Sequence, residues 1–520
     1  MDDTASLYDA IPYGGSPVTE SHPGRLAALG ILHGMRPAPA SACRVLELGA
    51  ANGGNLIPLA SRYPESRFLG VDISPGQVAS GRELIAALGL DNIELLAGDL
   101  LELADTLGPF DYILAHGLYS WVSVPVRRRI LELVSRTLAP QGIAFVSFNA
   151  LPGWRGVRGA LREMLRHFSR KAGTPREQVA AARSGLDFLI SGYGSAEVLE
   201  ARLLLHECRR LQAATDGYLF HEYLAPINDP FLWVTFVEHL AEAGLVPITD
   251  VDLAIASPLA YGETVAETFA TGSGDPHEVA QRLDFIGNRS FRRSLIGHRG
   301  VALATEPMWE RLPELELIAQ CEAEVPPELR RSKPSPYLLA GGERVMVHQP
   351  LTKAALEILG GSYPETRSLS SLAPEAAERV RRVGGGAFAE AFPDLLGEMA
   401  SLVVRGAIGV CGSGWRGGAD LVRPRLRPLA EAGIQLGWDH VATLHHHRLP
   451  VDDFLRILAP LLDGTRELRQ IVAEMVPGIR LRPELLGGAA ARWSEARLGT
   501  ALGKRVEEAL RLLGRQGLLI

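Results

Sequence analysis

The chain has 520 residues, of which 47% are hydrophobic and 22% charged, a composition that excludes a disordered or a membrane-embedded protein and is typical of a globular one. At roughly 100 to 200 residues per domain, it should hold about three domains or two large ones. The formal net charge of −7 argues against a general nucleic-acid binder, because neutralising phosphates requires a surplus of Lys and Arg.

The N-terminal stretch MDDTASLYDAIPYGG has neither a basic start nor an apolar core, so it does not read as a signal peptide. No segment reaches the roughly 18 apolar residues that a membrane span requires. The four cysteines are too few and too scattered for a disulfide framework or a CxxC metal site, so we expect buried thiols. They are Cys43, Cys208, Cys321 and Cys411. These features predict a cytoplasmic protein.

Residues 44–48, RVLEL, predict a short buried parallel strand, and residues 55–63, NLIPLASRY, predict the first turns of a helix. Such a strand-to-helix turn lies where ligands bind in open α/β sheets, and small residues let its backbone approach a ligand closely. By itself, the turn also fits a tight connection without a ligand. The small residues are Gly49, Ala50, Ala51, Gly53 and Gly54.

Four more strands are predicted downstream, and each has a polar residue at or just past its end. Helices are predicted between them, notably SPGQVASGRELIAALGL with Ser74 as its N-cap and VPVRRRILELVSRTLA with one apolar face. The strands are RFLGVDIS with Asp72, IELLAGDLLEL with Asp99, FDYILAHG with His116, and GIAFVSFNALPGW with Asn149. This order predicts an α/β fold whose polar residues cluster at the strand ends.

Asp72 follows Gly54 by 18 residues, close to the roughly 20 expected for an acid that binds a ribose hydroxyl. A dinucleotide site needs G-x-G-x-x-G, whereas the pattern here is E-x-G-x-x-x-G-G. Glu47 would repel a pyrophosphate, but it suits a cofactor that carries an ammonium and a sulfonium. S-adenosylmethionine (SAM) has both groups and a ribose.

The set Glu47, Gly49, Asp72 and GDL (residues 98–100) resembles the class I SAM-dependent methyltransferases. The resemblance implies a Rossmann-like sheet of seven strands. It also implies that Asp72 binds the ribose, Asp99 the adenine amino group, and the Gly49–Asn55 loop the methionine portion. The implied cofactor residues are Glu47, Gly49, Ala51, Asn52, Gly53, Asn55, Asp72, Ile73, Asp99, Leu100 and His116.

More specific segments are HGLYSW (116–121), FNALPGW (148–154) and FHEYL (220–224). They are similar to methyltransferases with a methyltransferase regulatory domain, typified by the rickettsial protein-lysine methyltransferases that act on outer membrane proteins. The similarity covers about the first 300 residues, and a weaker match, LLDGTREL, lies near the C-terminus. Arg155 stands where the lysine methyltransferases have His, and Gly14, Gly15 and Val18 replace bulkier residues. These changes leave the cofactor assignment intact but bear on the acceptor.

Methyl transfer is an in-line displacement, so catalysis depends mainly on holding the acceptor close and aligned. A lysine acceptor, with a pKa near ~10.4, must also lose a proton. We expect Asn149 and Tyr119 to orient the acceptor and His116 to act as a base or a cofactor contact. Trp121 and Trp154 are expected to line the channel and attract a cation. Each also fits a purely structural role, as a core aromatic or a helix cap.

Other polar residues have competing interpretations. Tyr8, Tyr13 and His22 precede the first strand and form either a lid or a segment packed on the sheet. His221 and Glu222 are expected to form interdomain hydrogen bonds. The run His445, His446 and His447 suggests a metal, but adjacent side chains point apart, so we expect no metal site and favour a solvated or partly buried face.

The predicted organisation has four parts: a SAM-binding core with an N-terminal lid (1–154), a helical insertion (155–215), a regulatory segment that returns to the sheet (216–300), and a mainly helical, winged-helix-like accessory domain (301–520). Winged helices often bind DNA. Because this region lacks a concentrated basic recognition helix, we expect protein contact or substrate docking instead.

We therefore expect a SAM-dependent methyltransferase that modifies a protein or peptide side chain, with lysine the leading acceptor. A small-molecule N- or O-methyltransferase is the alternative enzyme. A regulator that binds SAM or S-adenosylhomocysteine without transferring a methyl group is the alternative from another class. The sequence does not indicate an oligomeric state.

Overall fold

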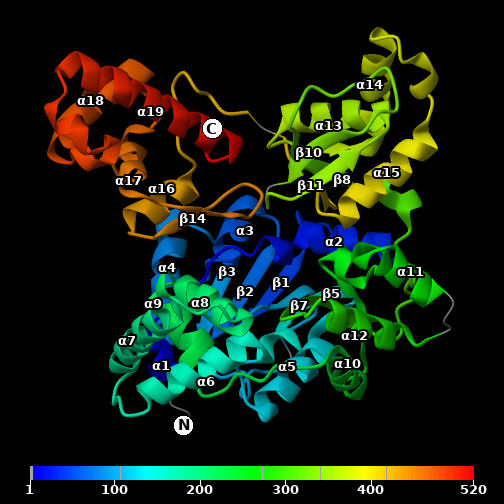
Figure 1. The fold of residues 1–520 in the computed structure, drawn as a ribbon, viewed down its shortest axis with the longest axis vertical. Helices are drawn as coiled ribbons and strands as arrows, with labels where there is room; N and C mark the ends of the chain where they lie inside the picture. The colour runs from blue at the N-terminus through cyan, green and yellow to red at the C-terminus, as the bar shows by residue number, and fades with distance from the viewer. Residues whose placement is uncertain (1–3, 106, 271–273, 340, 417) are drawn as a thin grey trace.

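The computed structural model describes residues 4–105, 107–270, 274–339, 341–416 and 418–520. A large α/β region forms the base of the molecule, and two smaller lobes project from the same side of it (Figure 1). One lobe has its hydrophobic core between residues 312 and 410, with Ala28 and Leu32 added from the N-terminal part. The other has its core between residues 426 and 519.

The central sheet has seven strands in the order β3-β2-β1-β4-β5-β7-β6. The first five strands pair in parallel, and β7 runs antiparallel to both of its neighbours. This confirms the predicted Rossmann-like sheet. The strands are β1 (Arg44–Leu48), β2 (Arg67–Asp72), β3 (Ile93–Ala97), β4 (Phe110–Ala115), β5 (Leu138–Asn149), β6 (Leu245–Asp250) and β7 (Phe291–His298).

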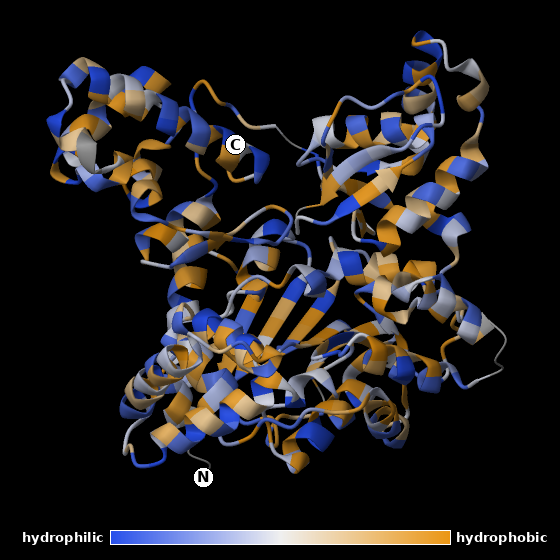
Figure 2. Ribbon diagram, in the orientation of Figure 1, coloured by the Kyte–Doolittle hydropathy of each residue, from blue (hydrophilic) through white to orange (hydrophobic). Residues whose placement is uncertain are grey.

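Helices cover both faces of this sheet, which explains why its strands are continuous apolar runs. On β1, Val45 belongs to one hydrophobic cluster, and Leu46 and Leu48 belong to the other. The strands are accordingly mostly hydrophobic in Figure 2. One face packs on α2 (Pro23–Leu32), α3 (Leu56–Arg62) and α4 (Pro75–Leu88), and the other on α5 (Val124–Thr137) and α10 (Trp233–Glu242).

The helical insertion has its own apolar cluster, in which Ile11 from the N-terminal segment packs with the inserted helices. Its helices are α6 (Val157–Ser169), α7 (Pro175–Tyr193), α8 (Leu199–Gln212) and α9 (Asp216–Leu219). They lie beside α1 (Thr4–Ala10) at the lower left of Figure 1. The segment FHEYL forms a π-helix, Phe220–Leu224, directly after α9.

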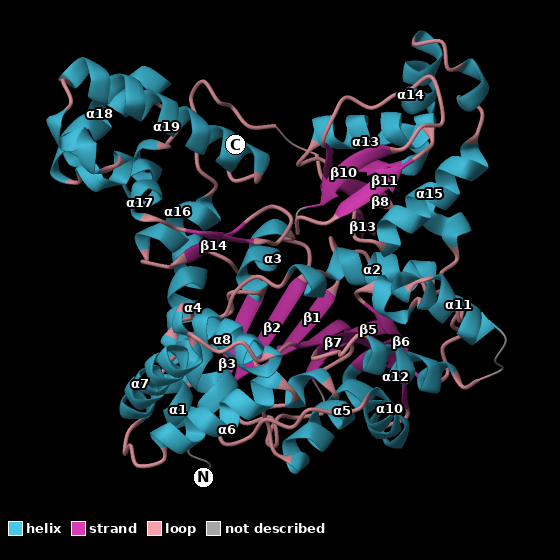
Figure 3. Ribbon diagram, viewed as in Figure 1, coloured by secondary structure: helices cyan, strands magenta, loops and turns pink. Residues whose placement is uncertain are grey.

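The lobe at the upper right of Figure 3 combines two three-stranded sheets with three helices. Its elements are β8 (Glu316–Ala319), β9 (Cys321–Ala323), β10 (Ser335–Leu339), β11 (Arg344–Val347), β12 (Arg367–Ser368), β13 (Ile408–Cys411), α13 (Pro350–Ser362), α14 (Leu369–Arg382) and α15 (Phe392–Val404).

The other lobe is mainly helical and carries one small β-hairpin. It contains α16 (Pro428–Gln435), β14 (His440–Ala442), β15 (Arg448–Pro450), α17 (Asp453–Leu458), α18 (Leu468–Leu481) and α19 (Glu495–Arg515). Residues 301–520, expected as one accessory domain, therefore contain two separate cores. Among the described residues, no helix is both long and apolar enough to cross a bilayer. All four cysteines are free thiols, three of them buried.

A buried ion cluster joins β6 and β7 to α12 (Pro276–Ile286). The Arg292 guanidinium, 1% exposed, donates to Asp284 at 2.8 Å and pairs with Asp250 on its other side. Its cationic carbon also lies 4.2 Å from the ring centre of Trp233. Arg289 also lies 3.6 Å from Asp284, and Ser294 donates to Asp250 at 2.8 Å, but removing Arg292 would still leave two buried carboxylates near a single cation.

We expect Arg292→Met to lower the free energy of unfolding by about 3–5 kcal/mol, as breaking a buried ion pair does. Urea unfolding followed by circular dichroism measures the difference. Arg511→Met is the matched control, because Arg511 pairs with Glu507 at 3.1 Å on an exposed face. That change should cost about 0.5 kcal/mol or less. Equal stabilities of the two variants would contradict a structural role for the cluster.

Candidate active site

The turn between β1 and α3 has an unusual backbone. Gly49, Ala51 and Gly53 adopt φ values of +77°, +49° and +73°, in the left-handed region where a bare backbone costs least. Asp72, at the end of β2, holds this turn. Its carboxylate accepts from the Ala51 N–H at 2.8 Å and from the Ser74 N–H at 2.9 Å, which ties the turn to the start of α4.

Glu47 lies beneath the turn and is 4% exposed. One carboxylate oxygen, Oε1, accepts from Asn55 Nδ2 at 2.8 Å, while Oε2 has no hydrogen-bond partner among the described residues. Burial raises the pKa of Glu47 to about 8, against the lowering effect of the Asn55 hydrogen bond, and the charge of Asp72 raises it further. The Oε2 atom could therefore accept a hydrogen bond from the ammonium group of a ligand.

The side chains of Asn52 and Asn55 point to the N-terminal segment instead of being free for a ligand. Asn52 Oδ1 accepts from the Gly15 N–H at 3.0 Å, and Asn55 Oδ1 accepts from the Val18 N–H at 2.9 Å. Asn52 and Asn55 were expected to bind the cofactor as part of the Gly49–Asn55 loop, and that role remains a prediction. Their backbone lies in the ligand turn, but their side chains hold the segment that covers it.

The N-terminal segment packs tightly on the turn, and this accounts for a departure from the family pattern. A Cβ on Gly15 would lie 2.6 Å from Asn52 Oδ1, and one on Gly54 would lie 2.2 Å from the Gly15 carbonyl oxygen. A side chain therefore does not fit at Gly15, whereas a Cβ on Gly14 would meet nothing within 4 Å. Glu20 in the same segment pairs with Arg293 on β7 at 2.5 Å, so the segment spans from β1 to β7.

Ile73, Asp99 and Leu100 line the neighbouring strand ends. Asp99 Oδ1 accepts from the Leu101 N–H at 2.9 Å, and Leu100 is buried in the core. The Gly98 N–H donates to the Asp72 carbonyl at 2.9 Å, so the loop after β3 lies directly beside Asp72. The backbone thus brings the expected ribose and adenine residues together at one edge of the sheet.

Tyr119 does not take the orientation expected of it. It is 1% exposed, and its hydroxyl hydrogen-bonds to His239 Nδ1 on α10 at 3.0 Å. Its ring packs among Phe148, Phe231 and Phe236. Tyr119 is therefore a core residue, because the loop after β4 turns its side chain toward α10.

His116 follows β4 with its ring between Phe145 and Phe291, and its Nδ1 lies 3.0 Å from Ser147 Oγ. Burial lowers the pKa of His116 to about 4, although Glu20 raises it. An imidazole that gives up its proton at so low a pH is a poor base for an alkyl ammonium. The structure therefore disfavours the expected role as a base and leaves a neutral polar contact.

Asn149 is buried, and its amide donates to Asn228 Oδ1 at 2.9 Å. The Asn228 amide donates in turn to the Glu222 carbonyl at 3.4 Å, so Asn149 braces the π-helix. Trp121 and Trp154 meet edge to face, with ring centres 6.1 Å apart. Both expected channel residues thus lie together, with Trp154 buried.

The π-helix places Glu222 directly after His221, whose ring contacts aromatic rings of the N-terminal segment, an arrangement that the sequence did not reveal. Tyr8 stacks on His221 at 4.3 Å between ring centres, and Tyr13 approaches the same ring edge-on at 5.5 Å. Burial raises the pKa of Tyr8 to about 12, and the charges of Asp72 and Glu222 raise it further. We call Tyr8, Tyr13, His221 and Glu222 the aromatic enclosure.

No hydrogen bond or ion pair to the Glu222 carboxylate occurs within the described ranges. Three arginines lie near the Glu222 carboxylate, but their hydrogen bonds and ion pairs are made with other groups. Arg158 and Arg210 pair with Glu207, and Arg162 donates to the Ala225 carbonyl. Burial raises the pKa of Glu222 to about 7, although these three cations lower it. The carboxylate is therefore unpaired and titrates near neutral pH. In the sequence, FHEYL stood out as one of the segments that carry the family resemblance, but that resemblance does not reveal an unpaired carboxylate.

The described residues contain no group of three or more metal-ligating side chains placed to hold a metal ion. The three adjacent histidines point apart. His445 Nε2 lies 2.6 Å from the Pro364 carbonyl, His446 Nε2 lies 2.7 Å from Asn55 Oδ1, and His447 Nδ1 lies 2.9 Å from Thr19 Oγ1. His446 is buried and the other two are half-buried, in line with the partly buried face that was expected, and each side chain connects the hairpin to another segment.

Three family models match the chain. They are described as a methyltransferase domain (residues 45–142), a predicted methyltransferase regulatory domain (215–298) and a PKMT C-terminal winged helix domain (423–518). The third match confirms the winged helix expected in the C-terminal part. It coincides with the lobe that carries β14 and β15 and excludes the other lobe.

An uncharacterized protein of Rickettsia prowazekii is 28% identical over 474 residues, which cover 89% of this chain and 84% of that protein. A second one is 35% identical over 231 residues, 44% of this chain and 92% of that protein. The structure of PKMT2 from Rickettsia typhi in complex with AdoHcy superposes with a TM-score of 0.83, at 25% identity, over 98% of this chain and 100% of that one. The chain therefore belongs to the SAM-dependent methyltransferases that carry a methyltransferase regulatory domain, the family of these rickettsial proteins.

Proposed function

We propose that this methyltransferase modifies a lysine amine of a protein substrate. The observation that carries the proposal is the Glu222 carboxylate, which has no hydrogen-bond or ion-pair partner among the described residues and directly follows His221, whose ring contacts Tyr8 and Tyr13. Aromatic faces and a carboxylate together suit a cation. The likeness to PKMT2 and to the PKMT winged helix domain supports a protein acceptor.

One ring of the enclosure reaches the protein surface, which supports an acceptor side chain that enters from outside. Tyr13 is 39% exposed, whereas Trp154 and Tyr223 are buried, with ring centres 6.3 Å apart. An alkyl ammonium on a long stem fits such a site, because its stem packs along apolar rings while its charge reaches a carboxylate. A metabolite methyltransferase would be expected to have a closed chamber.

SAM, when bound, supplies a sulfonium methyl group for in-line attack by the acceptor nitrogen. In this proposal, Asp72 binds the ribose hydroxyls, and the free Glu47 oxygen binds the ammonium of the methionine portion. The acceptor must arrive as a neutral amine, so Glu222 takes its proton. A carboxylate with a pKa of about 7 is well suited to this task. At neutral pH about half of such groups are ionised and free to accept a proton, and the proton is then held firmly enough to leave the amine.

The acceptor class can be tested with methyl-labelled SAM, the purified protein and a lysate of its native host. We expect label in the acid-precipitated protein, recovered after hydrolysis as methyl-lysine, and none with Asp72→Ala. Label only in the extractable small molecules would instead identify a metabolite methyltransferase. Label on another amino acid would keep a protein acceptor but reject lysine.

Glu222→Gln should lower this labelling by about 100-fold or more, since general-base catalysis contributes on that scale, and leave the affinity for S-adenosylhomocysteine unchanged. The wild-type rate should fall as the pH drops through about 7, because protonated Glu222 cannot accept a proton. Glu200→Gln, on an exposed position of α8, is the control. A Glu222→Gln enzyme with wild-type activity and pH profile would rule out this role.

Glu47 predicts a separate pH dependence of cofactor binding. Its pKa of about 8 means that it is mostly protonated in the free protein at neutral pH, whereas an ammonium partner favours the ionised form. The affinity for S-adenosylhomocysteine, measured by calorimetry, should therefore rise from about pH 6 to about pH 8, with proton release on binding. Glu47→Gln should bind more weakly and show neither the pH dependence nor the proton release.

A further inference from the structure

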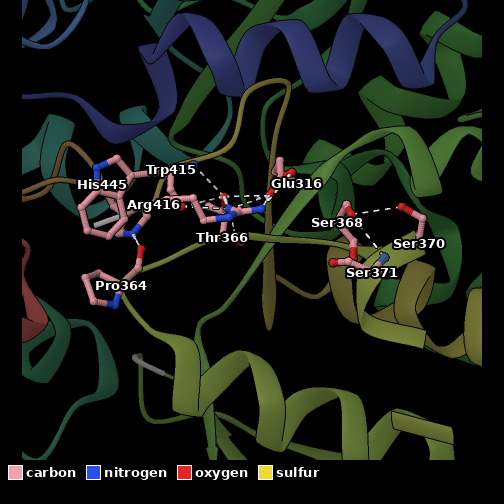
Figure 4. A network of polar contacts seen from close by, with 9 residues as sticks. All are labelled: Glu316, Pro364, Thr366, Ser368, Ser370, Ser371, Trp415, Arg416 and His445. Carbon is pink, nitrogen blue, oxygen red and sulfur yellow. Dashed lines mark hydrogen bonds and ion pairs between the residues drawn. The ribbon is translucent and has the colours of Figure 1, made fainter. Parts of the chain in front are cut away.

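The hairpin of β14 and β15 carries the three histidines at its tip, and each one contacts a different part of the chain. His445 meets Pro364 of the neighbouring lobe, beside Trp415, as Figure 4 shows. His447 meets Thr19 of the N-terminal segment, whose hydroxyl also donates to the His446 carbonyl at 2.9 Å. His446, between them, reaches Asn55 at the ligand turn.

His446 is held in an uncommon conformation. Its φ is +61°, in the left-handed region that residues other than glycine rarely adopt. Its side chain is 2% exposed, and its ring lies edge to face with His22, with ring centres 5.8 Å apart. Surrounding contacts must hold such a residue in place, so the position of its imidazole is well determined.

The hydrogen bonds around Asn55 determine how its amide is oriented and which of the neighbouring groups donate to it. Asn55 Oδ1 faces the Val18 N–H at 2.9 Å, and a backbone N–H can only donate, so the amide oxygen must lie on that side. His446 Nε2, 2.7 Å from the same oxygen, is therefore a donor. Burial lowers the pKa of His446 to about 3, so the ring is neutral at ordinary pH and its one proton sits on Nε2.

With its oxygen fixed in this way, Asn55 turns its amide nitrogen toward Glu47. Nδ2 donates to Glu47 Oε1 at 2.8 Å and to Ser21 Oγ at 3.0 Å. The bond to Glu47 favours the ionised carboxylate and leaves Oε2 as the oxygen without a described partner. The path from the C-terminal lobe to the candidate ammonium site thus consists of two hydrogen bonds in series.

We propose that His446 is a positioning residue for the cofactor site, which acts through Asn55 to orient and ionise Glu47. The winged-helix lobe would then be part of the cofactor site and not only a module for protein contact. The inference does not depend on the acceptor, so it stands or falls separately from a lysine substrate.

The test compares two substitutions at His446 by calorimetric titration with S-adenosylhomocysteine. Asn tolerates φ near +60° better than His, so His446→Asn should fold at least as stably, but its short side chain stops before Asn55. We expect it to weaken binding about fivefold to tenfold. His446→Gln places an amide nitrogen near the position of Nε2 and should bind within about twofold of the wild type. Thermal melting verifies that each variant is folded.

A double-mutant cycle with Glu47→Gln separates positioning from a general structural effect. If His446 acts through Glu47, His446→Asn should cost almost no further affinity in the Glu47→Gln background. In the wild-type background, His446→Asn should also move the pH dependence of binding to higher pH. Without His446, Asn55 holds its hydrogen bond to Glu47 less well, and losing that bond raises the pKa of Glu47. His447→Ala, which removes only the contact to Thr19, should leave that pH dependence in place.

Three results would each overturn the proposal: wild-type affinity in His446→Asn, additive losses in the cycle, or an unchanged pH dependence in His446→Asn.

Discussion

The side-chain amide of Asn55 is the group on which the contacts around the ligand turn depend. It is buried at the start of α3, and it joins the N-terminal segment, the first strand of the sheet and the C-terminal lobe. An amide has one acceptor and one donor end, and here the backbone N–H of Val18 settles which end faces which partner. Replacing either end would leave a buried polar group unpaired, which costs more than the bond itself contributes.

The fold of the α/β region could be predicted from its sequence because the evidence is local. Apolar runs that end in polar residues predicted β1 to β5, and Ser74 caps α4 as expected, accepting from Gln77 at 3.2 Å. Asp72 lies at the end of β2 beside the glycine turn, as its spacing from the glycines predicted. These features follow from strand and helix geometry within about twenty residues, so no distant contact can alter them much.

The surroundings of Tyr119 and Glu222 could not be predicted because distant packing decides them. The side-chain direction of Tyr119 depends on α10, more than a hundred residues away in the chain. Glu222 is turned by a π-helix and braced from β5 through Asn149. A single sequence contains the residue types but not these distances. Similarly, the three partners of the histidine run could not be inferred from the run itself.

The contact between His446 and Asn55 spans 391 positions of the sequence, and this has a consequence for synthesis. Domains generally fold in order as a chain leaves the ribosome, so the sheet and its ligand turn are in place long before the hairpin emerges. The bond that completes the surroundings of Glu47 can form only after most of the protein has been translated. Nascent and prematurely terminated chains that lack the hairpin therefore carry the glycine turn and Asp72 without this support.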